Sequence, residues 1–351
     1  MARDRNCGGM MYGFELSGEH EKLPEAEILA LLETYGVKVA KISRLNRLLL
    51  VTLEERMQPD QFSEFLSRIA LSHIVIDVFE VVSADFDAIR DAASRMAPSI
   101  SGSYAVDATV WDEEDLTSTE LERSVGALIN HESSWVDLEK PDTIVKLYVI
   151  SKRCVIGRVV HTRSKQEFAE RAPKRRPFFA PGVLKPKIAR ALVNLCHIKP
   201  YECLVDPFVG TGGILLEAGL MGIRVIGLDA QEKMITGASR NLEELEEVDL
   251  ILGDARSIPF KNGSAAGVVT DLPYGRSSKI KGESIDSLYR DAIFEIFRLL
   301  KKGRFAVIIS DKPIGDNIKK SGFLVIDKYS MRIHRSMTRR IYFLKKDTEV
   351  P

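Results

Sequence analysis

The first third of the chain alternates strand-like and helix-like patterns of apolar residues. Helical spacing of apolar residues predicts two helices, at 24–35 and 61–69. Short apolar runs predict four strands, at 12–16, 38–42, 48–53 and 73–82. The resulting order, strand-helix-strand-strand-helix-strand, is that of a ferredoxin-like unit. We therefore expect an α+β domain over residues 1–84.

A second, shorter α+β module is expected over residues 85–162. Its pattern predicts a helix at 86–95, a strand at 104–110, a helix at 118–130 and two strands at 143–150 and 154–161. The residues between the last two strands are typical of the tight turn of a hairpin. Residues 162–174 then lose apolar periodicity and become polar, so we place a linker at 163–175.

From Cys203 onward the pattern changes to short strands that alternate with helices. Five strands are predicted at 203–205, 224–228, 248–252, 266–270 and 304–309. No convincing helix separates the last two apolar segments, 323–329 and 341–344, which favours an antiparallel closing pair. We therefore expect an α/β, Rossmann-like domain with a seven-stranded mixed sheet over residues 176–351.

Composition changes this picture little. The 351 residues suffice for two or three domains. The chain has no run of eighteen apolar residues and no secretory pattern at its start, so we expect a cytoplasmic protein without a membrane segment. Its four cysteines form no C-x-x-C pair and no zinc-ligand spacing, so we assign no metal and expect reduced thiols.

Charge is balanced overall but unevenly distributed. The 50 basic and 50 acidic residues give a formal net charge of zero. The segment 171–190 nevertheless contains basic residues and no acidic one, and a second acid-free basic segment covers 328–346. Such a segment can be a solvated face or a surface for nucleic-acid phosphates, and charge alone does not decide between them.

A glycine-rich loop follows the first strand of the expected sheet. It runs from Asp206 to Gly213 with the sequence DPFVGTGG, where the glycines allow close backbone approach to a ligand. Asp229 ends the next strand, where an acid can accept hydrogen bonds from ribose hydroxyls, and Asp254 follows the third. The candidate cofactor residues are Asp206, Phe208, Gly210, Thr211, Gly212, Gly213, Asp229, Asp254 and Ala255.

Two other interpretations of this loop are a structural tight turn and an NAD site. The spacing Gly-Thr-Gly-Gly departs from the G-x-G-x-x-G of dinucleotide-binding loops. The preceding Asp206 suits the ammonium group of a methionine moiety better than a pyrophosphate, because of the sign of its charge.

The most informative motif is Asp271-Leu272-Pro273-Tyr274-Gly275, directly after the fourth strand of the sheet. An exocyclic base amine is a poor nucleophile, since its lone pair is delocalised into the ring. The carboxylate of Asp271 and the carbonyl of Pro273 could each accept one N–H and turn the lone pair toward a methyl donor. Tyr274 could stack on an extruded base. The competing interpretation is a plain β-turn, which does not require the aromatic residue.

These motifs carry a family resemblance. Residues 271–274 resemble motif IV of amino-group methyltransferases, and residues 206–213 look like their cofactor motif I. The preceding modules look like the N-terminal half of THUMP-containing tRNA enzymes. The whole order, together with Leu16-Ser17-Gly18-Glu19, residues 23–27 and Arg176-Pro177-Phe178-Phe179, is similar to archaeal tRNA (guanine-10-N2)-dimethyltransferases.

The resemblance implies a class I methyltransferase domain that uses S-adenosyl-L-methionine, with a THUMP module over 85–162 that binds tRNA. It implies formation of N2-methylguanosine and N2,N2-dimethylguanosine at position 10, with Asp271, Pro273 and Tyr274 as catalytic residues. Leu272 departs from the proline of many relatives, which puts the stiffness of the motif loop in doubt. In this frame the candidate RNA-binding residues are Arg171, Lys174, Arg175, Arg176, Arg276, Lys279 and Lys281.

Three alternatives remain open at this point. The first is methylation of guanine-6, since enzymes acting there share the motif IV. The second is a different amino-group substrate, an adenine N6 or a glutamine amide, which the THUMP-like half disfavours. The third is a catalytically silent RNA-binding adapter, which the intact 271–274 motif disfavours. The expected oligomeric state is a monomer.

Overall fold

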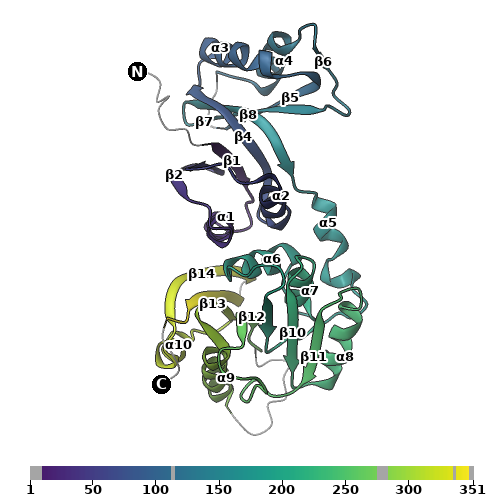
Figure 1. Ribbon diagram of the computed structural model, residues 1–351, viewed down its shortest axis with the longest axis vertical. Helices are drawn as coiled ribbons and strands as arrows, with labels where there is room; N and C mark the ends of the chain where they lie inside the picture. Colours follow the sequence, from purple (N-terminus) through teal and green to yellow (C-terminus); the bar gives the residue numbers. More distant parts are fainter. Residues whose placement is uncertain (1–9, 112–114, 275–283, 335–336, 348–351) are drawn as a thin grey trace. The chain divides into compact units, whose positions relative to one another are not determined.

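The chain folds into two compact units. The computed structural model describes residues 10–111, 115–274, 284–334 and 337–347. The first unit groups residues 1–18, 37–62 and 72–163, and the second groups 19–36, 63–71 and 164–351. Figure 1 colours the chain from its N-terminus to its C-terminus.

One eight-stranded sheet runs through the first unit, in the order β2-β3-β1-β4-β8-β7-β5-β6. The long strand β4 pairs antiparallel with β1 on one side and with β8 on the other. The strands of the two predicted α+β modules therefore form a single continuous sheet. The strands are β1 (Met11–Leu16), β2 (Val39–Leu45), β3 (Leu48–Leu53), β4 (Ser72–Ser83), β5 (Gly102–Trp111), β6 (Ser134–Val136), β7 (Thr143–Ile150) and β8 (Arg153–Thr162).

Two helices of this unit, α3 (Phe86–Met96) and α4 (Ser118–Ile129), pack on the sheet through a shared apolar core. Each begins at a side chain that accepts a backbone N–H: Asp85 caps α3 and Thr117 caps α4. The turn between β7 and β8 places Ser151 and Lys152 at φ values of +50° and +61°. These two consecutive left-handed residues match the twist of the hairpin, as expected from its sequence.

The second unit includes α1 (Leu23–Thr34) and the end of α2 (Pro59–Arg68), both contributed by the N-terminal third of the chain. Helix α1 packs against α6 (Pro186–Leu195). The fully buried carboxylate of Glu27 accepts hydrogen bonds from the backbone N–H of Ala70 at 2.9 Å and of Leu71 at 2.8 Å, and from Nδ2 of Asn194 at 2.8 Å. Nε of Arg68 donates to Oδ1 of the same Asn194 at 3.2 Å.

The sheet of the second unit has seven strands in the order β11-β10-β9-β12-β13-β15-β14. The pairings are parallel except at β15, which is antiparallel to both β13 and β14. This confirms the predicted Rossmann-like mixed sheet with its antiparallel closing pair. The strands are β9 (Cys203–Asp206), β10 (Arg224–Asp229), β11 (Val248–Leu252), β12 (Ala265–Asp271), β13 (Leu300–Ser310), β14 (Leu324–His334) and β15 (Met337–Lys345).

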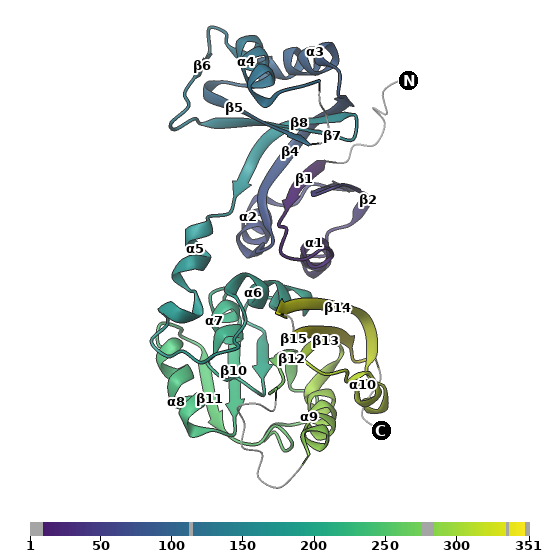
Figure 2. The same cartoon turned by 180° about the vertical axis from the view of Figure 1, so that it is seen from behind.

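Helices cover both faces of this sheet. One core contains buried residues of α6, α7 (Gly213–Gly219) and α8 (Glu232–Asn241), and the core on the other face contains those of α9 (Ile285–Leu299) and α10 (Gly315–Ser321). Figure 2 shows the two groups of helices on opposite sides of the strands. Among the described residues, no helix is both long and apolar enough to cross a membrane.

A helix in the linker and one short strand are among the elements that were not predicted. The polar segment taken as a linker contains α5 (Lys165–Glu170), which Ser164 caps by accepting the N–H of Gln166. The ring of Phe168 in this helix is 4% exposed and belongs to the core of the second unit. A single apolar anchor shows no periodicity, so the pattern could not indicate this helix. The three-residue strand β6 was too short to stand out for the same reason.

Candidate active site

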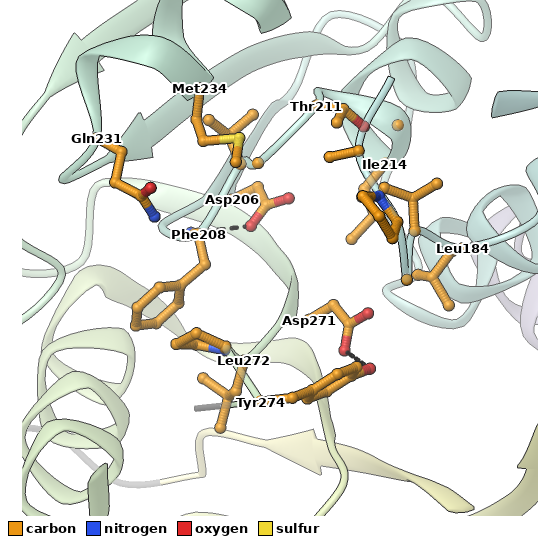
Figure 3. A pocket seen from close by; sticks show the side chains of 18 residues that line it. Leu184, Asp206, Phe208, Thr211, Ile214, Gln231, Met234, Asp271, Leu272 and Tyr274 are labelled. Atoms are coloured by element: carbon orange, nitrogen blue, oxygen red, sulfur yellow. Dashed lines mark hydrogen bonds between the residues drawn. The ribbon is translucent and has the colours of Figure 1, made fainter. Parts of the chain in front are cut away.

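A cavity at the carboxyl ends of β9 and β12 brings the two main sequence motifs together. Its wall includes Asp206 and the glycine-rich loop from one strand, and Asp271 to Tyr274 from the other. Figure 3 shows the carboxylates of Asp206 and Asp271 on the same hollow, with Gln231 and Met234 on one side and Leu184 and Ile214 on the other. Strands β9 and β12 are parallel neighbours, so the loops that follow them meet at the same edge of the sheet.

The glycine-rich loop turns at two residues with left-handed backbone, Gly210 at φ +51° and Gly212 at φ +77°. A Cβ at Gly212 would also come within 3.1 Å of Leu242, so both backbone angle and space favour glycine there. A Cβ at Gly213 would lie 2.6 Å from Nη1 of Arg176. The loop is thus shaped by its glycines, as its sequence predicts.

Asp206 is buried at the floor of the cavity. Its Oδ1 accepts hydrogen bonds from the hydroxyl of Thr270 at 2.7 Å and from the backbone N–H of Phe208 at 3.1 Å. Burial raises the pKa of Asp206 to about 7, and the charges of Asp271 and Asp229 also raise it, against the lowering effect of the two hydrogen bonds. A positively charged ligand group beside these acids would relieve this unfavourable electrostatic environment.

Four predicted cofactor residues lie outside the cavity wall: Gly212, which shapes the loop, and the three residues Asp229, Asp254 and Ala255. Asp229 accepts the N–H groups of Gly210 at 3.1 Å and Gln231 at 3.0 Å, which fixes its carboxylate behind the glycine-rich loop. Asp254 pairs with Arg256 at 2.6 Å, and this hydrogen bond lowers its pKa. Ala255 is 3% exposed and belongs to the apolar core between the sheet and α9.

The loop at 271–274 is anchored by Leu272, the residue that departs from the family motif. Its side chain is 1% exposed and lies in the core, and its backbone N–H donates to the carbonyl of Ile309 at 2.9 Å. Proline could not make this bond, since it has no N–H. Leu272 therefore anchors this loop through a buried side chain and a backbone hydrogen bond, where a proline would contribute a rigid ring.

The two groups expected to accept the N–H bonds of the amine, the Asp271 carboxylate and the Pro273 carbonyl, each already accept a hydrogen bond from a tyrosine. The hydroxyl of Tyr274 donates to Oδ1 of Asp271, and the hydroxyl of Tyr289 donates to the carbonyl oxygen of Pro273 at 2.5 Å. A carboxylate has about four lone-pair positions and a carbonyl has two. Each acceptor can therefore still receive an N–H from a ligand. Tyr289 lies in α9, and nothing in its helical apolar pattern distinguished it from the core residues around it.

Burial also raises the pKa of Asp271, to about 6. Arg339 and the hydrogen bond from Tyr274 oppose this effect, and the nearby charge of Asp311 adds to it. The side chain of Asp271 remains 17% exposed, consistent with its place on the cavity wall. A carboxylate with this pKa is ionised at neutral pH and can still take up a proton.

The wall is completed by residues that the sequence analysis did not identify. They are Gln231 and Met234 and the segment from Ala180 to Leu184. Asn241 connects Phe178, which precedes this segment, with the glycine-rich loop: its Oδ1 accepts the N–H of Phe178, and its Nδ2 donates to the carbonyls of Phe178 and Thr211, all at 2.8 Å. The only signal for this segment was the Arg176-Pro177-Phe178-Phe179 part of the family resemblance.

The acid-free segment 171–190 is not free of acidic partners in space. The carboxylate of Glu217, on α7, is fully buried and pairs with Arg171 at 2.8 Å and with Arg190 at 2.9 Å. Arg176 is 9% exposed and packs beside Gly213. Arg171 is thus paired with an acid distant in sequence and Arg176 is largely buried, and a role of either residue in RNA binding stays a prediction.

Lys174 and Arg175 are exposed and remain candidates for phosphate contact. The other three predicted RNA-binding residues, Arg276, Lys279 and Lys281, lie outside the described residues.

The lining of the cavity fits the chemistry of S-adenosylmethionine. The two carboxylates on its wall, Asp206 and Asp271, suit its ammonium and sulfonium charges by sign. Phe208 and Met234 offer apolar surface for an adenine ring, and the amide of Gln231 offers a donor and an acceptor.

Comparison with known proteins agrees with this geometry. Residues 173–341 match the family described as RMKL-like methyltransferase domain, UPF0020, and residues 83–159 match the THUMP domain. The crystal structure of TrmN from Thermus thermophilus is similar in fold, with a TM-score of 0.56 and 22% identity over 96% of this chain and 99% of that one.

Two relatives are similar over nearly their full length. The tRNA (guanine(10)-N2)-dimethyltransferase of Methanothermobacter thermautotrophicus is 34% identical over 94% of this chain and 98% of its own. The enzyme of the same name from Pyrococcus abyssi is 34% identical over 95% of this chain and 99% of its own. These findings confirm the resemblance seen in the sequence motifs. The chain belongs to the family of THUMP-containing methyltransferases that includes the tRNA (guanine(10)-N2)-dimethyltransferases.

Proposed function

We propose that this protein transfers methyl groups from S-adenosyl-L-methionine to the exocyclic N2 of guanine-10 in tRNA, giving N2-methylguanosine and then N2,N2-dimethylguanosine. One observation carries the proposal: the glycine-rich loop after Asp206 and the loop from Asp271 to Tyr274 line the same cavity. The expected site of the cationic methyl donor is therefore adjacent to the expected site of the amine that receives the methyl group.

The cofactor is held by the loop from Asp206 to Gly213. Asp206 receives the ammonium group, and Gly210 to Gly213 bring backbone close to the methionine moiety. Phe208, with Gln231 and Met234, contacts the adenosine. Asp229 acts indirectly, by fixing Gly210. When bound, S-adenosylmethionine supplies an electrophilic methyl group, which leaves its bonding electrons on sulfur.

Asp271 and Pro273 prepare the nucleophile. One N–H of the guanine amine donates to the Asp271 carboxylate and the other to the Pro273 carbonyl, so that the nitrogen lone pair turns out of conjugation. The nitrogen that gains a methyl group releases one proton. The Asp271 carboxylate, with its pKa raised to about 6, can receive that proton before it passes to water.

Tyr274 stacks on the extruded guanine. Its hydroxyl is bonded to Asp271 and to Arg339, which leaves the ring little freedom to rotate away from the cavity wall. A fixed ring offers a stacking surface at low entropic cost, since its side-chain freedom is already lost.

The RNA is held by the other parts of the chain. In this proposal residues 1–84 form the ferredoxin-like domain, 85–162 the THUMP domain that binds tRNA, 163–175 the linker and 176–351 the methyltransferase domain. Lys174 and Arg175 contact phosphate, as do Arg276, Lys279 and Lys281, which lie outside the described residues. Such contacts set position rather than sequence. The enzyme acts as a monomer in the cytoplasm.

The test is methyl transfer from radiolabelled S-adenosylmethionine to tRNA transcripts, with mass-spectrometric mapping of the product. Transcripts with adenosine in place of guanosine at position 10 or at position 6 separate the proposed target from the guanine-6 alternative. We expect label to be lost only with the position-10 transcript. Label in DNA or protein alone would indicate a different amino-group substrate. Failure to bind S-adenosylmethionine in a calorimetric titration would favour the adapter.

A further inference from the structure

Arg339 contacts three residues of the cavity wall. It projects from β15 and is 5% exposed. Its Nε donates to the hydroxyl oxygen of Tyr274 at 2.9 Å, and its Nη2 donates to the carbonyl oxygen of Gly182. The same Nη2 lies 3.6 Å from Oδ2 of Asp271. One guanidinium therefore contacts the motif loop at two side chains and the 180–184 segment at its backbone.

The three partners require the shape of arginine. A guanidinium presents its donors in a rigid planar fork. Its hydrogen bonds to Tyr274 and Gly182 therefore fix the position of the charge that faces Asp271. A lysine ammonium supplies the same charge from one nitrogen on a flexible stem. Charge and geometry at this position are therefore separable by substitution.

We propose that Arg339 is a positioning residue for methyl transfer, which orients the Tyr274 ring and the Asp271 carboxylate toward the incoming amine and keeps that carboxylate ionised. This inference rests on the proposed function and extends it to a residue outside both sequence motifs. Arg339 acts through Tyr274 and Asp271 rather than on the reacting atoms.

The charges around Asp271 support the second part of this role. Asp311, after β13, raises the pKa of Asp271, and Asp206, on β9, interacts with it as another acid. Tyr274 donates a hydrogen bond to Asp271, and Arg339 supplies the opposing positive charge from β15. The pKa of Tyr289, on α9, is raised in part by the charge of Asp271. Removing the cation would therefore favour the protonated carboxyl group, which is a weaker acceptor and cannot take up the released proton.

The experiment compares Arg339→Gln, which removes the charge, with Arg339→Lys, which keeps the charge but loses the fork. Lys320→Gln, an exposed residue on α10, removes one positive charge from the same unit and serves as the control. Single-turnover methylation of tRNA is followed from pH 5 to pH 9 at saturating S-adenosylmethionine. Cofactor affinity is measured by calorimetry and folding by thermal unfolding.

For Arg339→Gln we expect the acidic limb of the rate profile to move up by about one pH unit, the change expected when a close opposite charge is removed. We also expect the plateau rate to fall at least tenfold, with the enzyme concentration that half-saturates the single-turnover rate within twofold of wild type. Arg339→Lys should restore the acidic limb but not the plateau. An unmoved limb together with an unchanged plateau in Arg339→Gln would overturn the proposal.

Two further measurements keep the inference testable. If Arg339→Gln fails to fold, a double-mutant cycle between Arg339→Lys and Tyr274→Phe replaces it, and additive losses would refute action through the Tyr274 hydroxyl. If the wild-type protein methylates no tRNA, the proposed function fails on its own. The carboxyl 13C titration of Asp271 in wild type and Arg339→Gln then tests the electrostatic role without activity, and an identical pKa in both would reject it.

Discussion

The hydroxyl of Thr270 donates a 2.7 Å hydrogen bond to Oδ1 of Asp206, and both residues are buried. Thr270 directly precedes Asp271 on β12, and β12 lies parallel to β9, the strand that ends at Asp206. This bond therefore connects the acid of the cofactor loop with the strand end that carries the proposed amine acceptor.

Replacing Thr270 with valine should weaken cofactor binding. Valine keeps the branched shape but removes one of the two hydrogen bonds that Oδ1 of Asp206 accepts, and a hydrogen bond to a charged group contributes about 1.5–3 kcal/mol. We expect calorimetry to show a loss of at least about tenfold in S-adenosylmethionine affinity, which corresponds to about 1.4 kcal/mol. Thr270→Ser retains the hydroxyl and should bind nearly as well as wild type. Equal affinity of the valine and serine variants would contradict this role.

Asp271→Ala should reduce turnover far more than cofactor affinity. The interaction of its carboxylate with the amine matters mainly in the transition state, and loss of such a group costs about 10²-fold or more in kcat. Steady-state kinetics and a calorimetric titration of the same preparation separate the two effects. A parallel loss of kcat and of S-adenosylmethionine affinity would instead assign Asp271 to cofactor binding.

The rate of methyl transfer should rise with pH through an apparent pKa near 6. The ionised carboxylate of Asp271 is the stronger acceptor of an N–H and can take up the released proton, and its pKa is raised to about 6 by burial. Activity is therefore lost as pH falls through this value and is constant above it until another group titrates. A pH profile of single-turnover rates checks this. A limb near the ordinary aspartate pKa of about 4 would show that Asp271 is better solvated than its burial implies.

The contribution of Asp206 to the stability of the fold should fall with increasing pH, whereas the methylation rate rises. Its folded-state pKa of about 7 lies above the ordinary aspartate value of 3.8, so between these values the folded state holds a proton that the unfolded state has released. The contribution of Asp206 to stability is therefore lost as pH rises from about 4 to about 7. Asp206→Asn should become more stable relative to the cofactor-free wild type as pH increases over this range. Thermal unfolding at about pH 5 and about pH 8 measures the difference, and a constant offset would contradict the raised pKa.

Tyr289→Phe should lower kcat without affecting the fold. The substitution keeps the buried ring in α9 but removes the hydroxyl that donates to the Pro273 carbonyl. A hydrogen bond with a net value of about 1 kcal/mol corresponds to about a fivefold fall in rate. Tyr104→Phe removes a matching 2.5 Å bond to the Gly126 carbonyl in the first unit and should leave the rate unchanged. A rate loss of the same size in both variants would indicate a general structural effect.

Reversing the charges of Lys174 and Arg175 to glutamate should weaken tRNA binding and reduce its dependence on salt. Both side chains are exposed, and a phosphate that the protein no longer neutralises keeps its condensed counterions, so that fewer ions are released on binding. Filter binding between about 50 and about 200 mM salt tests this prediction. We expect about a tenfold loss of tRNA affinity at the lower salt concentration. The Lys319→Glu, Lys320→Glu double variant on α10 carries the same charge change as a control. Identical salt slopes in the two variants would remove the linker from the RNA-binding surface.

Much of the catalytic fold follows from local sequence. The alternation of apolar runs and helices predicts a mostly parallel sheet, and parallel strands bring the loops after β9 and β12 to one edge. The meeting of Asp206 and Asp271 at one cavity could therefore be anticipated before any contact was known.

Other parts of the site depend on contacts that no local pattern records. Arg339 arrives from the antiparallel end of the sheet, and the partner of Arg171 and Arg190 is a glutamate on a different helix. A basic segment is recognised from residues that are adjacent in sequence, whereas the electrostatic potential around it depends on charges that are close in space. The sequence could therefore not indicate the ion pair of Arg171 or the burial of Arg176.

The buried hydrogen bonds of Glu27 and Arg68 to Asn194 affect which fragments of the enzyme can keep the second unit intact. A fragment that starts at the linker would strip away α1 and the end of α2, exposing the apolar side of α6 and leaving the Asn194 amide without these donors and acceptors. A single proteolytic cut cannot release an intact catalytic half. Truncation studies would have to carry residues 19–36 and 63–71 along, as a co-expressed or grafted piece.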